Sequence, residues 1–348
     1  MDQLQFYTGK RVLVTGGSGS IGSEIVRQLL ELPVEVVRVF SRDETRQVSL
    51  QQSLGRDPRV RFLIGDVRDR ERLRRGLDGI DTVFHAAALK HVPVCEYNPF
   101  EAVQTNVIGT QNVITVGREA GVKRIVVIST DKAVIPENTM GATKLLSERL
   151  VAAASRFMPG LVLCAVRFGN VLGSRGSVLP RVRSQIREQR CVEVTDRKMT
   201  RFFMTLGQAV SLVLKAARLA AGGELFVLPM PKLRVIDLLE VLVQEECASL
   251  GIPPESIRFK EVGRRPGERL HEMLLTPLEC ERARRCDGLI VVSPDGGEEE
   301  PAPEGLDHSA FRSETGPFLS KEKIAELLHR AGLSGCPASP ELETSSAL

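Results

Sequence analysis

Several common signals are absent from this sequence of 348 residues. No window approaches the roughly 18 consecutive apolar residues of a membrane-spanning helix, and residues 1–10 lack the apolar core of a signal peptide. The seven cysteines are scattered and never spaced as Cys-x-x-Cys, so neither a zinc site nor a disulfide framework is indicated. We therefore expect a soluble cytoplasmic protein that holds no metal and does not insert into a membrane.

Charge of one sign is also lacking. The 47 basic and 44 acidic side chains leave a net charge of +3, with a sequence pI near 8.5. This balance falls far short of the strongly basic composition of nucleic-acid binders, and it suits an anionic small molecule equally well. We therefore expect no nucleic-acid partner.

The first half of the chain alternates short apolar runs with amphipathic stretches. This alternation predicts an α/β fold, in which helices cover both faces of a doubly wound parallel sheet. The predicted strands are 11–15, 34–40, 59–64, 82–85, 124–129 and 161–168. The predicted helices are 22–32, 45–54, 69–76, 106–120, 141–157, 206–221 and 235–244. Ligands of such sheets bind beyond the C-terminal ends of the strands, so the segments that follow strands are where chemistry is expected.

A glycine-rich turn follows the first predicted strand directly. Glycines spaced by threes allow a tight turn and a close approach of the backbone to a pyrophosphate, and the next helix offers unpaired amide donors at its N-terminus. The residues expected to contact the cofactor here are Gly16, Ser18, Gly19, Ser20, Ile21 and Gly22. A chance glycine-rich turn is the alternative, but the position between a strand and a helix favours a dinucleotide site.

The end of the second predicted strand indicates which dinucleotide is bound. An acidic residue there would favour NAD, whereas this strand ends in Ser41 and Arg42, and a guanidinium suits the 2′-phosphate of NADP. NADP is therefore favoured, although the neighbouring Asp43 keeps NAD open. Further expected cofactor contacts are Asp66, Val67, Ala86, Ala87, Ala88, Asn106 and Lys144.

The predicted large domain spans residues 8–168, with a returning segment at about 200–228. After residue 168 the alternation gives way to loops rich in glycine, proline and arginine, which predicts a smaller, interleaved substrate lobe at 169–199 and 229–292. Residues 293–305 resemble a linker of proline, glycine and glutamate, 306–333 form a C-terminal segment, and 334–348 are expected to be a mobile polar tail.

An acid and a base follow the strand predicted at 124–129. Thr130, Asp131 and Lys132 come directly after it, and Met140 and Lys144 open the next predicted helix. This position predicts catalysis. The alternative, a surface ion pair between Asp131 and Lys132, would contribute little to stability.

Six motifs share this order with one known family. They are HAAALKHVP at 85–93, STDKA at 129–133, MGATK at 140–144, RFGNVLGSRGSV at 167–178, MTRF at 199–202 and RRPGERLHE at 264–272. Over residues 8–290 the chain resembles the polysaccharide-biosynthesis UDP-N-acetylglucosamine 4,6-dehydratases. The resemblance implies a Rossmann fold of the extended short-chain dehydrogenase/reductase type, NADP, a UDP-sugar substrate, hydro-lyase activity and a homo-oligomer.

Tyrosine is the residue most conspicuously missing from the expected site. Short-chain dehydrogenases place a tyrosine four residues before a lysine, which lowers the pKa of the tyrosine so that it can deprotonate a sugar hydroxyl. Met140 occupies that position, and neither Tyr7 nor Tyr97 precedes a lysine by four residues. The chain matches the methionine-bearing group of the family, which the resemblance associates with retained configuration at carbon 5.

The resemblance also implies a set of roles. Hydride leaves carbon 4, and Lys132 removes the proton on carbon 5, provided that burial and cations such as Lys144 keep it unprotonated. Asp131 donates a proton to the hydroxyl that departs from carbon 6. The hydroxyl on carbon 4 loses its proton to Asp131 or to a water held by Thr130. His85 is expected to be a packing residue.

The second half of the chain supplies cations and hydrogen-bonding groups for a UDP-sugar. The expected substrate contacts are Lys90, Asn170, Arg175, Ser177, Arg201, Arg265 and Glu268. By resemblance, Arg265 and Glu268 hold the pyrophosphate and the ribose. Two other functions remain open: a nucleotide-sugar epimerase or reductase on the same fold, which normally needs the missing tyrosine, and a non-catalytic NADP-binding regulator, which would not need Asp131 and Lys132 together.

Overall fold

The computed structural model describes residues 2–294 and 306–334. Most of the predicted linker at 293–305 and of the predicted tail at 334–348 lies outside the described residues. Within those residues, no helix combines the length and the apolar character needed to cross a bilayer.

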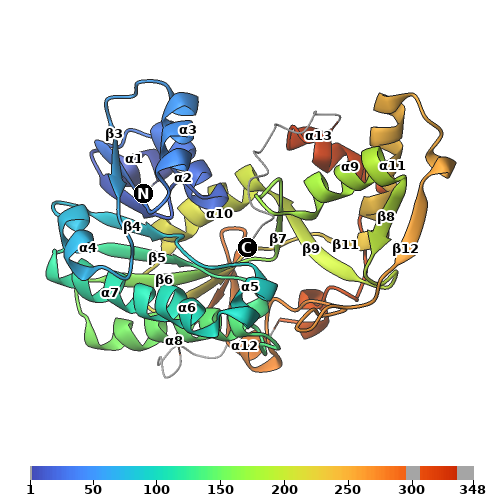
Figure 1. The fold of residues 1–348 in the computed structure, drawn as a ribbon. Coiled ribbons are helices and arrows are strands. Elements are labelled where there is room, and N and C mark those ends of the chain that lie inside the picture. The colour runs from blue at the N-terminus through green and yellow to red at the C-terminus, as the bar shows by residue number, and fades with distance from the viewer. Residues whose placement is uncertain (1, 295–305, 335–348) are drawn as a thin grey trace.

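A nine-stranded sheet forms the centre of the larger part of the molecule (Figure 1). Its order is β13-β14-β10-β6-β5-β4-β1-β2-β3. The strands are β1 (Arg11–Thr15), β2 (Val36–Ser41), β3 (Val60–Ile64), β4 (Thr82–His85), β5 (Arg124–Ile128), β6 (Val162–Arg167), β10 (Leu225–Val227), β13 (Ala283–Cys286) and β14 (Leu289–Val292). All pairings from β3 to β10 are parallel, and β14 and β13 add an antiparallel edge.

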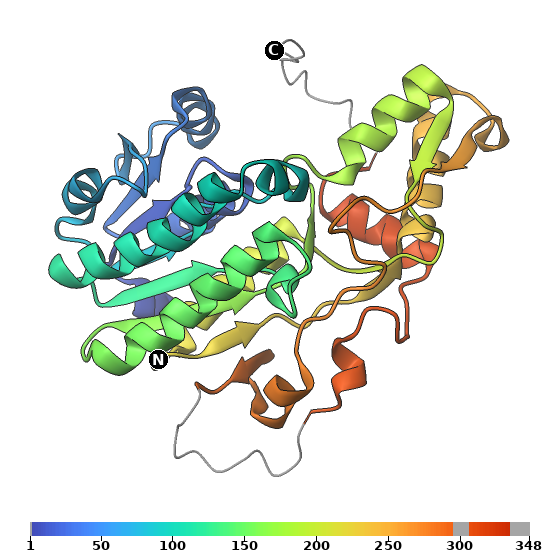
Figure 2. The ribbon, with the colours of Figure 1, turned by 60° about the horizontal axis from the view of Figure 1, so that its bottom comes forward.

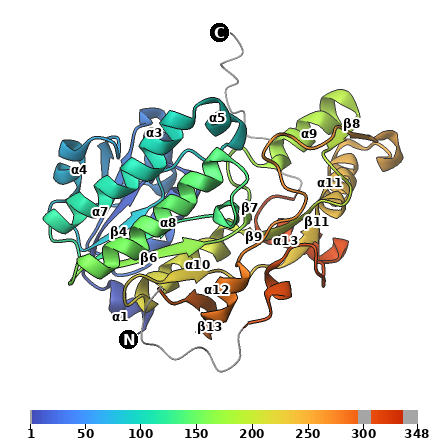
Figure 3. The same cartoon turned by 90° about the horizontal axis from the view of Figure 1, so that it is seen from below.

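Helices cover both faces of this sheet, as Figures 2 and 3 show. One layer holds α1 (Gln3–Tyr7), α2 (Ser20–Leu30) and α10 (Leu206–Leu219), and the other holds α4 (Arg70–Leu77), α7 (Gly109–Glu119) and α8 (Thr139–Phe157). Successive residues of a strand point to opposite faces. In β1, Val12 and Val14 therefore pack with the first layer and Leu13 with the second. The apolar runs in the sequence arise because both faces are buried.

A smaller lobe lies beside the sheet (Figure 1). Its strands are β7 (Asn170–Leu172), β9 (Thr200–Thr205) and β11 (Lys232–Arg234) in one sheet, and β8 (Cys191–Val194) with β12 (Arg258–Glu261) in another. Its helices are α9 (Val178–Gln189), α11 (Val235–Leu250) and α13 (Lys321–Arg330), which share a core of their own. The C-terminal segment thus returns to the lobe through α13.

The remaining elements are short, apart from α3. They are α3 (Glu44–Leu54), α5 (Val92–Tyr97), α6 (Pro99–Ala102), α12 (Pro277–Glu281), the π-helical η1 (Val103–Ile108), and the 3-10 turns η2 (Asp131–Ala133), η3 (Pro254–Ser256) and η4 (His308–Phe311). The turn η2 follows β5 directly, so it lies at the C-terminal edge of the sheet, where ligands of such folds bind.

The predicted α/β fold is confirmed, and all six predicted strands occur within two residues of their predicted ends. The second half of the chain differs in detail from the prediction. In the segment 229–292, which was assigned to the lobe, β13 and β14 extend the large sheet. In the returning segment 200–228, α10 and β10 pack on or join the large sheet, whereas β9 pairs within the lobe.

Candidate active site

The glycine-rich turn after β1 lies against the segment after β4, at the point where the strand order of the sheet reverses. Gly16 has a φ of +65°, and a Cβ on it would lie 2.7 Å from the amide nitrogen of Ala87. A Cβ on Gly22 would lie 2.3 Å from the carbonyl oxygen of Gly16. Only glycine satisfies both positions, and the bare backbone leaves room for a phosphate to approach closely.

The N-terminus of α2 offers donors to an anion. The N-cap residue is Gly19, which has no side chain. No N-cap side chain therefore accepts hydrogen bonds from the amides of the first turn. Ser18 Oγ lies 2.8 Å from Ser41 Oγ, and Gln47 Nε2 donates to the same Ser41 hydroxyl at 2.9 Å. These bonds hold the end of β2 against the glycine-rich turn. The residues fit a dinucleotide.

The charged side chains near the end of β2 differ in exposure and in the number of their hydrogen-bond partners. Arg42 is half-exposed, and its Nη1 lies 3.5 Å from Asp66 Oδ2. Burial favours the neutral form of Asp66, but hydrogen bonds from Arg68 and the charge of Arg42 hold its pKa below the usual value. Asp43 accepts from the amide of Arg46 at 2.9 Å and so caps α3. The carboxylate that kept NAD open is therefore already engaged.

Other predicted cofactor residues make hydrogen bonds that connect neighbouring segments of the chain. Asn106 Oδ1 accepts from the amide of Leu89 at 2.8 Å, and Asn106 Nδ2 donates to Thr143 Oγ1 at 2.9 Å. These bonds tie the loop after β4 to α8. The buried Val67 contributes its carbonyl oxygen, which accepts from Asn112 Nδ2 at 3.1 Å. The backbone of Ala86 and Ala87 lies beside the glycine-rich turn, because a Cβ on Gly16 would lie within 2.8 Å of backbone atoms of both residues, and Ala88 follows them in the loop after β4.

His85 packs inside the sheet rather than facing the site. Its Nε2 lies 3.0 Å from Thr110 Oγ1, and its Nδ1 lies 2.7 Å from Thr15 Oγ1. Thr110 donates its hydrogen to the carbonyl of Asn106, so it accepts from His85 Nε2–H, and Nδ1 then accepts from Thr15. Burial lowers the pKa of His85 to about 3. The imidazole is neutral and fully paired, in agreement with the packing role expected of it.

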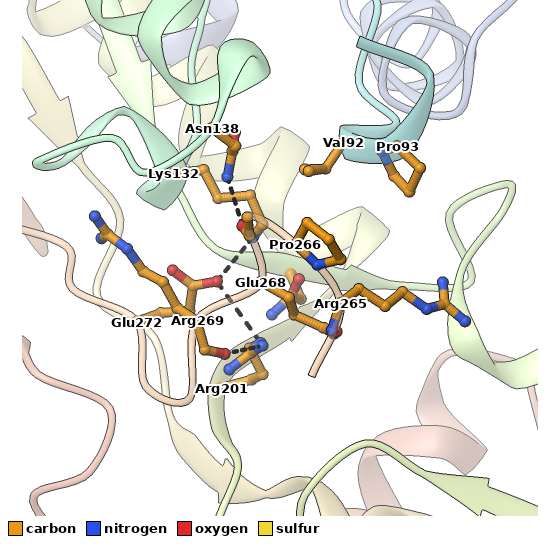
Figure 4. A pocket seen from close by; sticks show the side chains of 12 residues that line it. Val92, Pro93, Lys132, Asn138, Arg201, Arg265, Pro266, Glu268, Arg269 and Glu272 are labelled. Carbon is orange, nitrogen blue, oxygen red and sulfur yellow. Dashed lines mark hydrogen bonds and ion pairs between the residues drawn. The ribbon is translucent and has the colours of Figure 1, made fainter. Parts of the chain in front are cut away.

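Asp131 and Lys132 follow β5, and a second acidic residue, Glu272, lies beside Lys132 (Figure 4). Lys132 Nζ lies 3.0 Å from Asp131 Oδ1 and 3.3 Å from Glu272 Oε1. Thr130 Oγ1 is 2.9 Å from Asp131 Oδ1 and donates to it. Arg201 Nε lies 3.7 Å from Glu272 Oε1. Asp131 Oδ2 and Glu272 Oε2 are buried and have no hydrogen-bond partner among the described residues.

The electrostatics of Lys132 correct one expectation. Burial alone would lower its pKa, but the carboxylates of Asp131 and Glu272 together outweigh burial and raise it. Lys132 is therefore an ammonium in this structure, and Lys144 does not hold it unprotonated. The expectation was wrong because it left out the attraction of the two carboxylates, that of Asp131 first and that of Glu272 second, for the charged amine.

Lys144 and Met140 lie on the first turns of α8. Burial lowers the pKa of Lys144 to about 8, and the nearby carboxylate of Glu148 offsets part of this effect. Met140 is buried in a small apolar cluster with Cys95 and Ala102. A thioether in this setting cannot accept a proton from a sugar hydroxyl.

A cavity of about 200 Å³ opens beside Lys132, between the large sheet and the lobe. The predicted site residues among those that line it are Lys132, Asn170, Arg201, Arg265 and Glu268, and Glu272 lines it as well (Figure 4). Asn170 Nδ2 is buried without a partner among the described residues. Arg201 is fixed, because its guanidinium donates to the carbonyls of Leu270 and Arg269 at 2.9 and 2.7 Å.

Three predicted substrate residues lie apart from the residues that line this cavity. The backbone amide of Arg175 donates to Ser20 Oγ at 2.9 Å, and its guanidinium contacts the carbonyl of Ser18. Lys90 Nζ donates to the carbonyl of Arg175 at 2.5 Å. Arg175 and Lys90 thus lie over the glycine-rich turn. The hydroxyl of Ser177 is buried and unpaired among the described residues.

Sequence reasoning assigned no role to two groups of residues. Glu272 stood at the end of a quoted motif without a function. Arg167 is fully buried, and it donates to Glu148 Oε2 at 2.6 Å, Glu279 Oε2 at 2.9 Å and the carbonyl of Leu274 at 2.8 Å. Ser129 Oγ donates to Glu148 Oε1 at 2.5 Å. The available signal was an arginine inside an otherwise apolar strand, since a fully buried charge requires partners.

Comparisons with known proteins agree with this geometry. A protein of Methanocaldococcus jannaschii described as an uncharacterized membrane protein is 47% identical over 329 residues, which are 94% of this chain and 97% of the relative. A UDP-N-acetylglucosamine 4,6-dehydratase (inverting) of Campylobacter jejuni is 38% identical, covering 83% of this chain and 84% of the relative. A UDP-glucose 4-epimerase of Rickettsia felis is also 38% identical, with the same two coverages.

Two solved structures share the fold. Pen from Bacillus thuringiensis superimposes with a TM-score of 0.88 at 41% identity, covering 94% of this chain and 99% of that one. The dTDP-glucose 4,6-dehydratase from Streptomyces venezuelae, which was solved with NAD bound, gives a TM-score of 0.66 at 27% identity, covering 75% of this chain and 86% of that one. A family model described as polysaccharide biosynthesis protein matches residues 12–294. The chain therefore belongs to the polysaccharide biosynthesis protein family, on an extended short-chain dehydrogenase/reductase fold.

Proposed function

We propose that this chain is an NADP-dependent UDP-N-acetylglucosamine 4,6-dehydratase. It would release water and form a UDP-2-acetamido-2,6-dideoxy-4-keto-hexose for surface glycan or polysaccharide biosynthesis, with retained configuration at carbon 5. The observation that carries the proposal is the group of proton-transfer side chains at the end of β5. Asp131 and Lys132 lie there with unsatisfied acceptor atoms close by, beside a cavity lined by cations. The relative from Campylobacter jejuni supports the same reaction type.

The residues of the glycine-rich turn and Arg42 suit the cofactor. The bare backbone at Gly16 and the uncapped N-terminus of α2 would hold the pyrophosphate, and Arg42 would pair with a 2′-phosphate. A nicotinamide bound there would supply the hydride acceptor for carbon 4 and the hydride donor for carbon 6. Asp43 already caps α3, which favours NADP over NAD.

Asp131 is the better candidate for the hydroxyl on carbon 4. Thr130 already directs its hydrogen to Asp131 Oδ1, whereas Asp131 Oδ2 is buried and unpaired among the described residues. An unpaired carboxylate oxygen can accept the hydroxyl proton and later deliver it to the hydroxyl that leaves carbon 6. One proton then travels from carbon 4 to the departing water through a single side chain, and Met140 needs no role in proton transfer.

Lys132 is the candidate base at carbon 5, and the lobe supplies the substrate contacts. Arg265 and Glu268 would hold the diphosphate and the ribose, and Asn170 would contact the sugar. Lys132 lines the same cavity, so its side chain borders the space that a substrate would occupy. A proton removed from one face of carbon 5 and returned from the same amine retains the configuration.

The decisive experiment uses purified protein, UDP-N-acetylglucosamine and deuterated water. Mass spectrometry should show the loss of one water without net reduction of NADP. NMR of the product should show deuterium at carbon 5 and retained configuration at that carbon. A product of unchanged mass, or no product, would reject dehydration.

Epimerisation at carbon 4 is the second candidate, because relatives from Rickettsia carry the name UDP-glucose 4-epimerase at the same identity. An epimerase oxidises and reduces the same carbon, so it requires no base for carbon 5. Lys132 and Glu272 would then have no chemical task. Incubation with UDP-glucose and analysis for UDP-galactose tests this alternative directly.

A further inference from the structure

Glu272 is held rigidly against Lys132. The residue is 3% exposed, and its Oε1 lies 3.3 Å from Lys132 Nζ. Its backbone amide donates to Ser313 Oγ at 2.7 Å, and the amide of Ser313 donates to the Glu272 carbonyl at 2.8 Å. The C-terminal segment therefore fixes the backbone that carries this carboxylate. A carboxylate held in this way can take part in a reaction repeatedly from one position.

Lys132 needs such a neighbour if it is to act as a base. An ammonium has no lone pair, and two carboxylates raise the pKa of Lys132. Its proton must pass to an acceptor in contact with Nζ, and the contacts are Asp131 Oδ1 and Glu272 Oε1. Asp131 is committed to the proton of the carbon-4 hydroxyl and to the leaving group. Glu272 has no other task in the reaction.

We propose that Glu272 is a catalytic residue that accepts a proton from Lys132 and so converts Lys132 into the amine that deprotonates carbon 5. The inference rests on the proposed dehydration. One N–H bond of Lys132 breaks and its electron pair stays on nitrogen, while an O–H bond forms on Glu272. The ammonium and carboxylate become an amine and a carboxylic acid. When Lys132 has returned its acquired proton to carbon 5, Glu272 returns the stored proton to Lys132, and no net proton is consumed.

The surroundings of Glu272 favour this exchange. Burial raises the pKa of its carboxyl, and the charge of Asp131 adds to the effect, against the opposing charges of Lys132 and Arg201. Away from water, a neutral pair loses less solvation than an ion pair does, so the transfer costs less here than it would in solvent. Oε2 is unpaired among the described residues and offers a second position for the stored proton.

The test compares Glu272→Gln with Glu137→Gln. Glu137 is an exposed carboxylate that pairs at 3.2 Å with Arg269, one of the residues that line the cavity, and it has no proposed role. Two quantities are measured in each protein: the pH profile of dehydration, and the pKa of Lys132 from NMR of lysine labelled at Cε. The signal of Lys132 is assigned by its disappearance in Lys132→Arg.

Both the pKa of Lys132 and the rate of dehydration should fall in Glu272→Gln. Loss of a carboxylate lowers the pKa of Lys132, and loss of the proton acceptor slows dehydration by about 100-fold or more, the usual contribution of a positioned acid or base. If Glu272 were only an ion-pair partner, the pKa of Lys132 would still fall, but the rate would stay the same or rise, because a lower pKa provides more amine. A rate that is unchanged or increased in Glu272→Gln would therefore overturn the inference. Glu137→Gln should change neither quantity.

Folding and the proposed function are checked separately. Glu272→Asp keeps a carboxylate one methylene shorter, and it should dehydrate the substrate faster than Glu272→Gln at equal thermal stability and equal affinity for UDP. Equal rates in these two variants would count against proton acceptance. If Glu272→Gln fails to fold, the pH profile of dehydration is compared between Glu272→Asp and wild type instead. A wild-type protein that releases no water from UDP-N-acetylglucosamine rejects the proposed function itself, whereas an active wild type with a fully active Glu272→Gln rejects the inference alone.

Discussion

Two clusters of buried charge lie at the same edge of the sheet and differ in how completely they are satisfied. In the Arg167 cluster, formed by Ser129, Glu148, Arg167 and Glu279, both carboxylates are bonded through both oxygens. In the Lys132 cluster, formed by Asp131, Lys132, Arg201 and Glu272, each carboxylate keeps one oxygen without a partner among the described residues. A satisfied network makes a structure rigid, whereas an unsatisfied one leaves acceptor capacity for a substrate. The comparison separates a scaffold from a site.

The largest expected effect is on catalysis in the Lys132 cluster. Asp131→Asn should reduce turnover by about 10³-fold or more, because the amide cannot carry a proton from carbon 4 to the leaving hydroxyl. Its melting temperature should change little, because the amide oxygen of asparagine can keep the hydrogen bonds that Asp131 Oδ1 accepts from Thr130 and Lys132, and Oδ2 has no partner to lose. Steady-state kinetics and thermal denaturation measure both. An Asp131→Asn protein that kept full turnover but melted at a much lower temperature would show that Asp131 supports the structure and not the reaction.

The Arg167 cluster should show the opposite behaviour. Arg167→Met keeps a long side chain but leaves Glu148 and Glu279 as buried charges, which costs about 3–5 kcal/mol of the free energy of unfolding. Urea denaturation measures this change. Arg70→Met is the matched control, because Arg70 is half-exposed and pairs with Glu119 at the surface, and its removal should cost less than about 1 kcal/mol. Equal costs in the two variants would show that the Arg167 cluster is not a stabilising network.

Lys144 provides an intermediate case, a buried cation one helical turn before Glu148. Folding lowers its pKa from 10.5 to about 8, so between these values the unfolded chain binds more protons than the folded one. Stability from this group therefore increases as the pH rises through that window, by on the order of 2–3 kcal/mol. Urea denaturation of wild type and Lys144→Met at pH 7.5 and pH 10 should show this slope only in the wild type. Parallel pH profiles would contradict it.

The smallest expected effect concerns Arg42, a half-exposed cation that follows β2. Arg42→Ala should weaken NADP binding by about 10- to 100-fold, the usual range for a charge-assisted hydrogen bond, and should leave NAD binding unchanged. Fluorescence titration with the two reduced cofactors measures the two affinities. Arg61→Ala, on the neighbouring strand, serves as a control. Equal losses for both cofactors would remove the argument for NADP.

The sequence predicted the Rossmann half of the molecule well, because strands buried on both faces must be apolar throughout and their spacing repeats. It predicted the lobe poorly. Strands such as β7 and β11 have three residues each, which is too short for a periodic signal, and their partners are distant in the chain. The site followed the same rule: Asp131 and Lys132 could be identified from the strand before them, but Glu272 reaches them only through tertiary contacts.

The hydrogen bonds between Ser313 and Glu272 affect where this protein can be cut. The family match ends at residue 294, so a recombinant fragment trimmed to that boundary would contain every sequence motif. It would nevertheless lack Ser313, as well as the bridge that pairs Met273 with Arg312. Such a fragment would contain Glu272 but would lack the hydrogen bonds with Ser313 that fix its backbone. The segment that holds Glu272 in place therefore extends beyond the region by which the family is recognised.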